Sequence, residues 1–93
     1  MNKKRDRLQV IRDILESIKL KNGKIKPTHI MYKSNLSHKM MELYLKDLIS
    51  KNLIVELQTK QGKTYSLTNK GFEFLSKYSI IVEFMDSFGL NQT

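Results

Sequence analysis

The first apolar residues of the chain recur at intervals typical of one helix face. They lie three or four positions apart, with one extra neighbour: Leu8, Ile11, Ile14, Leu15 and Ile18. This spacing predicts an amphipathic helix over residues 5–20. The pair Asn22-Gly23 follows, and because glycine accepts a positive φ without steric cost, the pair predicts the end of that helix.

A break in the apolar pattern separates two further helices. Pro27 suits the first turn of a short helix over residues 28–33, where its missing N–H costs no hydrogen bond. Asn35 tolerates the left-handed conformation and predicts a turn. Ser37 is a favourable N-cap, so a third helix is predicted from there to about residue 51. Its inner face is predicted to consist of Met41, Tyr44, Leu45 and Leu48.

Residues 53–67 change to the two-residue period of a β-hairpin. Apolar Leu53, Val55 and Leu57 alternate with Ile54, Glu56 and Gln58. Residues 59–63 include Gly62 and predict a hairpin tip, and residues 64–67 predict the return strand. Thr68 is the predicted N-cap of a last helix, which runs to about residue 88.

The predicted order is helix, helix, helix, strand, strand, helix. It describes a mainly α fold with a small antiparallel β-hairpin, which is the winged helix-turn-helix arrangement (α-α-α-β-β-α). With 93 residues the chain accommodates one small domain with a modest core.

Charge is distributed unevenly along the chain. The net charge is +8, and residues 1–40 hold eleven Lys or Arg against three acids, whereas residues 41–93 hold six of each. One-sided basic charge indicates a polyanion partner, most often nucleic acid, although a solubility role is the alternative. Lysine outnumbers arginine 14 to 3, which favours phosphate contact over bidentate base reading and so modest sequence specificity.

Three segments of the sequence carry a family resemblance. They are RLQVIRDILESI, THIMYKSNLSHKMMELYLKDLISKNLI and YSLTNKGFEFL, which together span about residues 7–75. In these segments the chain resembles small archaeal winged-helix DNA-binding proteins with a long C-terminal dimerisation helix, some chromatin-associated and others transcription regulators. The resemblance implies double-stranded DNA as partner, a third helix that reads the major groove, a wing that contacts the backbone or minor groove, and a homodimer. The last helix here is shorter than in the best-known members.

A set of polar side chains is therefore predicted to contact DNA. The third helix presents one face opposite its buried centre, and its N-terminal N–H groups also favour phosphate. The candidates lie in the turn, on that face and at the hairpin tip: Lys33, Ser34, Asn35, Ser37, His38, Lys39, Glu42, Leu43, Lys46, Lys60, Gln61 and Lys63. A basic N-terminal arm of Lys3, Lys4, Arg5 and Arg7 is expected to order only on DNA.

Two residues on the predicted DNA-facing side of the third helix do not fit simple phosphate contact. Glu42 would be repelled by phosphate, so it either accepts from a cytosine amino group or pairs with Lys46 four residues on, and we favour the pair. Leu43, like Met40, either meets thymine methyl groups or packs on a neighbouring element or subunit.

The last helix carries more apolar surface than one small domain covers. Leu75, Tyr78, Val82 and Met85 follow helical spacing, and further apolar residues are Phe72, Phe74, Ile81, Phe84 and Phe88. A helix that is apolar on more than one side usually has a second partner. We predict a homodimer through Leu75, Tyr78, Val82 and Met85; the alternative is packing on the first helix of the same chain. Residues 1–67 then form the DNA-binding domain and residues 68–93 the dimerisation helix and tail.

Other classes of function find little support in the sequence. No set of nucleophile, base and metal ligands is apparent, and the four glycines are scattered, so we expect no enzyme, cofactor or small-molecule ligand. His29 and His38 lack the companions of a metal site. With no cysteine, no apolar run near 20 residues and no secretory signal, a cytoplasmic, nucleoid-associated protein is expected.

Three roles remain open from the sequence. The favoured role is a homodimeric transcription regulator. The first alternative is an abundant chromatin or architectural protein of low specificity. The second is a winged-helix adaptor without DNA contact, although an adaptor has no need of the basic surplus. RNA binding is weaker, because the aromatic residues follow core patterns rather than stacking platforms.

Overall fold

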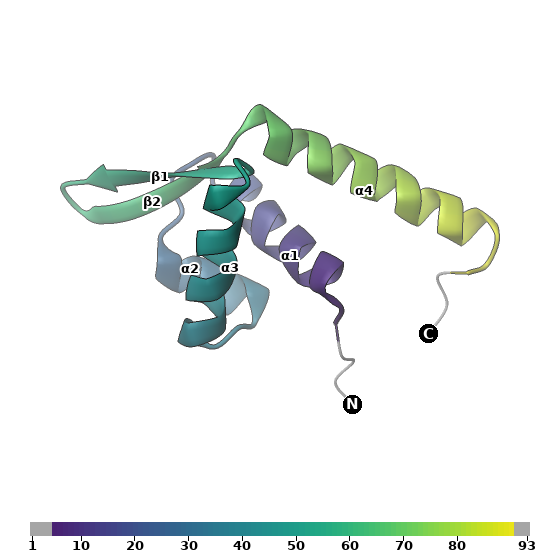
Figure 1. The fold of residues 1–93 in the computed structure, drawn as a ribbon, viewed down its shortest axis with the longest axis horizontal. Helices are drawn as coiled ribbons and strands as arrows, with labels where there is room; N and C mark the ends of the chain where they lie inside the picture. Colours follow the sequence, from purple (N-terminus) through teal and green to yellow (C-terminus); the bar gives the residue numbers. More distant parts are fainter. Residues whose placement is uncertain (1–4, 91–93) are drawn as a thin grey trace.

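The helices and strands follow the predicted order (Figure 1). The computed structural model describes residues 5–90. Its elements are α1 (Arg7–Leu20), α2 (Pro27–Ser34), α3 (His38–Ser50), β1 (Ile54–Thr59), β2 (Gly62–Leu67) and α4 (Asn69–Ser87). The mainly α fold with one antiparallel hairpin is thus confirmed, and no described helix is long and apolar enough to cross a membrane.

Local capping signals set the ends of α1. Asp6 and Gln9 form a capping box, in which Gln9 N donates to Asp6 Oδ1 at 2.8 Å and Asp6 N donates to Gln9 Oε1 at 2.9 Å. After the helix, Asn22 and Gly23 both take positive φ, 53° and 79°. The first helix therefore begins two residues later than predicted, because the capping side chain at position 6 lies outside the helix.

The break between α2 and α3 is a left-handed turn. Asn35 has φ 54° and caps α2, and Leu36 N donates back to Met31 O at 3.0 Å. Ser37 then starts α3, its hydroxyl accepting from Met40 N at 3.2 Å. Because the backbone reverses within three residues, α3 leaves α2 at a sharp angle, as a helix-turn-helix requires.

A single β-bridge joins the two-stranded hairpin to the loop between α1 and α2. β1 pairs with β2 from Ile54↔Leu67 to Thr59↔Gly62. Ile25 bridges to Tyr65, whose N–H donates to Ile25 O at 3.2 Å. This pairing fixes the base of the hairpin to the helical part of the domain.

The core lies between α1, α2, α3 and the base of the hairpin. Its fully buried side chains are Ile14, Leu15, Ile18, Ile25, Ile30, Leu48 and Ile54. α4 is different, because only its N-terminal part lies against the domain while its C-terminal half extends away from it (Figure 1).

A close backbone contact attaches α4 to the domain. Thr68 Oγ1 accepts from Gly71 N at 3.1 Å and donates to Asn52 O at 2.6 Å. A Cβ on Gly71 would lie 2.3 Å from Leu53 O, so only glycine allows this approach. One turn later Leu75 is buried in the core. The first two turns of α4 are therefore held by the chain itself.

Candidate nucleic-acid interface

α3 has one buried face and one exposed face. Met41, Leu45 and Leu48 pack into the core. The opposite surface, here called the outer face of α3, consists of His38, Lys39, Glu42, Leu43 and Lys46, all exposed. The helical periodicity of the sequence predicted this division correctly, and Ser37 stands at the N-terminal end as the cap.

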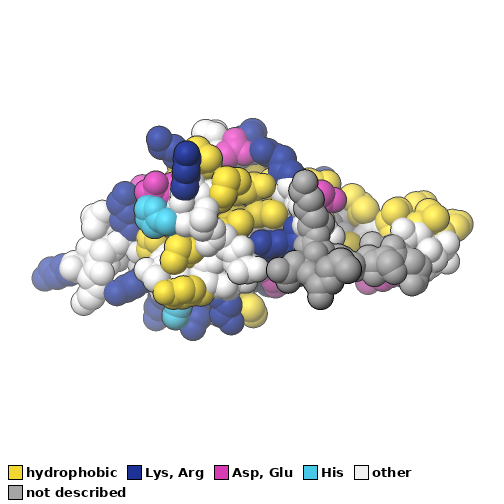
Figure 2. Space-filling model, turned by 90° about the horizontal axis from the view of Figure 1, so that it is seen from below, with side chains coloured by type: hydrophobic (Ala, Val, Ile, Leu, Met, Phe, Trp, Pro, Cys, Tyr) yellow, Lys and Arg dark blue, Asp and Glu magenta, His cyan; other side chains and the backbone are white. Residues whose placement is uncertain are grey.

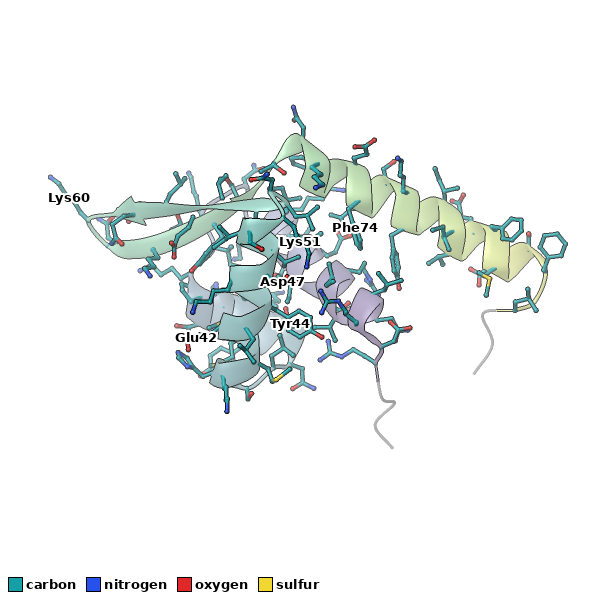
Figure 3. All side chains as sticks on the ribbon, viewed as in Figure 1. Glu42, Tyr44, Asp47, Lys51, Lys60 and Phe74 are labelled. Atoms are coloured by element: carbon teal, nitrogen blue, oxygen red, sulfur yellow. The ribbon has the colours of Figure 1, made fainter. Side chains whose placement is uncertain are left out.

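A groove of about 620 Å³ runs between the outer face of α3 and the hairpin. The strands contribute Glu56, Lys63 and Tyr65 to its lining. The hairpin projects from the domain beside α3, with Lys60 at its far tip (Figure 3). A helix flanked by a projecting wing is the shape that engages one groove of a duplex and the adjacent backbone.

One wall of this groove carries a polar network. Tyr65 Oη donates to Glu56 Oε2 at 3.0 Å, and Lys63 Nζ lies 3.3 Å from the same oxygen. Burial, together with the Glu56 carboxylate, raises the pKa of Tyr65 to about 12. Tyr65 therefore stays a hydrogen-bond donor at neutral pH, and Glu56 partly neutralises Lys63, a predicted phosphate contact.

The predicted pair between Glu42 and Lys46 is wrong. Glu42 Oε2 lies 3.9 Å from His38 Nε2 instead, one turn in the other direction. Glutamate and lysine do pair at the same spacing in α4, between Glu73 and Lys77, so spacing alone does not decide the partner of Glu42 and its side-chain rotamer does. Lys46 has no ion pair among residues 5–90 and is free to meet an anion.

The turn before α3 exposes fewer of the predicted side chains than expected. Ser34 is completely buried, so its assignment as a phosphate neighbour is wrong. It lies four residues after Ile30 on the inner face of α2, a spacing that the sequence already contained. Lys33 and Asn35 are exposed.

The hairpin tip is shaped by its own hydrogen bonds. Thr59 Oγ1 donates to Gly62 O at 2.7 Å and accepts from Gln61 N at 3.2 Å. Gly62 has φ 117°, a conformation that suits glycine. Lys60 and Gln61 are thus both exposed at the end of the wing.

Two arginines predicted to belong to a disordered arm are bound to the domain. Arg5 Nη1 lies 2.6 Å from Asp13 Oδ2, and Arg5 Nη2 donates to Asn35 O at 3.2 Å. Arg7 Nη2 lies 2.5 Å from Asp47 Oδ2. These long-range partners were not evident from the sequence. Lys3 and Lys4 lie outside the described residues.

Asp47 joins α3 to the start of α1. It accepts from both Arg7 and Lys51, and it lies on α3 with Lys51 one turn further on (Figure 3). The hydrogen bond from Lys51 lowers the pKa of the Asp47 carboxyl below its usual value, and Arg7 adds to the effect. Nothing in the sequence alone indicated this role, because Arg7 and Asp47 lie 40 positions apart along the chain.

All three arginines have partners within the domain. Arg5 and Arg7 make the ion pairs above, and Arg12 lies 3.4 Å from Asp13 and over the Tyr78 ring, 5.8 Å from its centroid. The cations of the outer face of α3 and of the hairpin tip are therefore lysines, with His38 beside them. No three His, Cys, Asp or Glu side chains within residues 5–90 gather as a metal site would need.

The predicted dimer contacts on α4 divide into two groups. Leu75 is 7% exposed and belongs to the core of its own chain, so its place in a dimer interface is wrong. Tyr78 stacks on Phe74 at 6.2 Å, and Val82 and Met85 are half-buried. The alternative of packing within the chain therefore holds for the start of the helix.

Exposed apolar residues lie elsewhere on the helix, and Phe72 and Ile80 are among them. Three more follow helical spacing toward its C-terminal end, with exposures of 60% for Ile81, 58% for Phe84 and 66% for Phe88 at the C-cap. These three form what is here called the outer stripe of α4. Hydrophobic side chains gather at that end of the molecule, away from the basic side chains of the domain (Figure 2). The sequence contained this second stripe, but periodicity alone does not say which of two apolar faces the chain covers itself.

Comparisons with known proteins agree on the fold. The winged helix-turn-helix family matches residues 4–86. Sso10a-2, a DNA-binding protein from Sulfolobus solfataricus, superposes with a TM-score of 0.78 and 18% identity over 90% of this chain and 85% of its own. No curated protein matches the sequence.

Two transcription regulators have the same fold in longer chains. MepR, which regulates the Staphylococcus aureus multidrug efflux pump MepA, has a TM-score of 0.76 and 18% identity over 90% of this chain and 64% of its own. CouR, a transcriptional repressor solved on a 23-mer DNA duplex, has a TM-score of 0.70 and 19% identity over 77% of this chain and 52% of its own. This chain thus spans less than two thirds of either regulator.

Proposed function

The chain belongs to the winged helix-turn-helix family, and on that basis we propose that it binds double-stranded DNA as a homodimeric transcription regulator. The observation that carries the proposal is the outer face of α3. It is exposed, it adjoins a projecting hairpin, and its lysines have no acidic partner among residues 5–90. Lysines so placed neutralise phosphates and release counterions, which supplies affinity.

Each part of the surface has a distinct role in this proposal. Lys39 and Lys46 meet phosphates or base edges in the major groove, and Lys60 follows the backbone beside it. His38 stands at the N-terminus of α3, where N–H groups also favour phosphate. Glu42 lies among these cations and accepts from a cytosine amino group or holds His38 in place.

Homodimerisation is proposed through the outer stripe of α4. Ile81, Phe84 and Phe88 leave apolar area exposed that a second copy covers, since an apolar stripe at helical spacing packs on another such helix. Residues 1–67 then bind DNA and residues 68–93 dimerise. A two-fold dimer presents two reading helices to a palindromic or closely repeated site. Such a protein acts at the nucleoid.

The second candidate is an architectural protein of low specificity. It is favoured by one observation: all three arginines contact acidic or aromatic side chains of the domain itself. Arginine reads guanine in a bidentate manner, whereas lysine contacts phosphate as a point charge. Sequencing of genomic fragments bound by the protein separates the candidates: a sharp motif supports the regulator, and even coverage supports the architectural protein.

DNA binding is tested by charge reversal on α3. Lys39→Glu with Lys46→Glu is compared with Lys70→Glu with Lys77→Glu, which makes the same charge change on exposed positions of α4. Titration of a random duplex at two salt concentrations should show strong, salt-sensitive binding for the wild type and the α4 control, and a loss of at least roughly tenfold for the α3 variant. Equal affinity of the two variants, or wild-type binding that is insensitive to salt, contradicts the proposal and favours an adaptor.

Dimerisation is tested by placing charge in the outer stripe. Ile81→Glu with Phe84→Glu should sediment as a monomer, because the change places two charges in the proposed dimer contact. The fold should be preserved, since both side chains are exposed in the single chain and the core is untouched. The matched control is Ser76→Glu with Ser87→Glu, two exposed serines on a different side of α4, which should remain a dimer. A stripe variant that still sediments as a dimer excludes this interface.

A further inference from the structure

A second group of lysines lies in the loop between α1 and α2, away from the residues assigned above. The group consists of Lys21, Lys24 and Lys26, all exposed. No acidic residue occurs in the sequence between Glu16 and Glu42. The loop therefore carries a concentrated positive charge that neither the outer face of α3 nor the hairpin tip requires.

A tight turn holds two of these lysines together. Lys24 N donates to Lys21 O at 3.0 Å, and the two central residues, Asn22 and Gly23, have φ of 53° and 79°. Two successive positive φ values close a primed β-turn, whose first and fourth Cα atoms lie within about 7 Å. The turn therefore holds the backbone of Lys21 close to that of Lys24.

The turn is fixed against β2. Tyr65 N donates to Ile25 O at 3.2 Å, and a Cβ on Gly23 would lie 2.9 Å from Ser66 Cβ. The lysine loop therefore belongs to the rigid part of the domain. Side chains presented from a fixed backbone lose less freedom on binding a partner than those on a mobile loop.

Strand alternation directs these lysines away from the groove beside α3. Ile25 is buried, and its bridge partner Tyr65 lines that groove. Neighbouring residues of an extended segment point to opposite sides, so Lys24 and Lys26 project from the other side of the sheet. We therefore expect a duplex bound by the outer face of α3 to leave Lys24 and Lys26 accessible.

The three lysines have no counter-ion of their own. None of them takes part in an ion pair within residues 5–90. Like charges held close on a rigid turn repel one another, and an external polyanion relieves that repulsion. Along the extended segment, Lys24 and Lys26 lie about 6.8 Å apart. This distance corresponds to roughly two phosphate steps along the axis of one DNA strand.

We propose that Lys21, Lys24 and Lys26 bind the phosphate backbone of a second DNA duplex, so that one domain bridges two duplexes. The inference rests on the proposed function, because the first duplex is the one held by α3. Contact here is to phosphate only, since a flat edge of sheet and turn places no helix in a groove. The bridging surface therefore adds compaction without adding sequence preference.

Capture of a second duplex tests the proposal. One biotinylated duplex is fixed to beads, the full chain is added, and retention of a free fluorescent duplex is measured alongside affinity for a single short duplex. Lys24→Glu with Lys26→Glu is compared with Lys39→Glu with Lys46→Glu, in wild type and in the Ile81→Glu, Phe84→Glu background. Lys26 makes no side-chain capping bond, so α2 keeps its start, and thermal unfolding checks that each variant is folded.

The loop variant should keep single-duplex affinity within about twofold and lose second-duplex capture at least tenfold in both backgrounds. The α3 variant should lose both. Three outcomes overturn the proposal: no capture by wild type, unchanged capture by the loop variant, or an equal fall in affinity and capture. In the second case bridging comes from the dimer alone, and in the third the loop belongs to the first interface. If single-duplex affinity and second-duplex capture fall only in the α3 variant, the bridging proposal fails but the proposed function stands.

Discussion

α3 and α4 each bury one side and expose the other, but their exposed sides differ in chemistry. α3 buries Met41, Leu45 and Leu48 and exposes lysines, a histidine and a glutamate, with Leu43 among them. α4 buries Gly71 and Leu75 and exposes Ile81, Phe84 and Phe88. A charged exposed surface suits a polyanion, whereas an apolar one suits another protein surface.

The two helices also differ in how the chain holds them. α3 is fixed along its whole length, by the turn at Asn35, by its inner face and by Asp47. α4 is held against the domain as far as Tyr78, over which Arg12 lies, and its C-terminal part then leaves the domain (Figure 1). This difference agrees with the proposed function, in which α3 enters a DNA groove in a fixed orientation and α4 packs on a second copy of the chain.

The largest effect should come from the buried start of α4. Leu75→Ala removes a core side chain that is 7% exposed and should lower the free energy of unfolding by about 3 kcal/mol. Ile81→Ala, at 60% exposure, should change the stability of the monomer by less than about 0.5 kcal/mol. Urea denaturation followed by circular dichroism, at protein concentrations below dimer formation, measures both. Equal losses would mean that the two halves of α4 are not distinct.

A slightly smaller effect is expected at the backbone contact that attaches α4. Gly71→Ala places a methyl group against Leu53 O and should cost roughly 2 kcal/mol as the helix shifts outward. Ser76→Ala, at an exposed position of the same helix, is the control and should be neutral or slightly stabilising. Thermal unfolding compares the two. If Gly71→Ala is as stable as the control, the close approach does not hold α4 in place.

Much of the fold could be predicted because its signals are local. Ser37 and Thr68 are N-caps, and Asn35 supplies the left-handed turn, as each residue type indicates. The pairing of Ile25 with Tyr65 could not be predicted, because it joins residues 40 apart through a single bridge. The same holds for Gly71, whose importance depends on a carbonyl that folding brings to it.

On α3 the expected effects are changes in affinity. Lys46→Ala should weaken binding to every duplex and lower the slope of log K against log salt by about 1, because one phosphate contact is lost. Leu43→Ala is the matched change on the same face and should leave that slope unchanged, since no charge is removed. Anisotropy titrations between about 50 and 200 mM salt give both slopes. A Lys46→Ala slope equal to the wild-type slope would show that this lysine meets no phosphate.

In the candidate site, helical periodicity determines which positions are exposed, whereas side-chain rotamers determine which partners they contact. The exposed positions of α3 follow from the 100° spacing of helical residues, and the structure agrees. The partner of Glu42 depends on the direction of its side chain, and the prediction of Lys46 failed there. The partners of Arg5 and Arg7 depend on the packed fold, so an arm that looked free in the sequence is held at two positions.

The smallest expected effect concerns the clamp between Asp47, Arg7 and Lys51. Hydrogen bonds lower the pKa of Asp47 in the folded protein from its ordinary 3.8, so the ionised carboxylate stabilises the fold above that value. The contribution is lost as pH falls below 3.8 through the folded pKa. Asp47→Asn should therefore be slightly less stable than wild type at neutral pH, with the difference closing in acid.

Urea denaturation at a series of pH values measures that difference, with Glu83→Gln on α4 as the control. Glu83 has no ion pair among residues 5–90, so its variant should follow the wild type throughout. A gap for Asp47→Asn that persists well below pH 3.8 would assign the loss to packing rather than to charge. A small effect is the expected result for an exposed clamp, because the buried residues already hold α3 and the ion pairs only refine its angle.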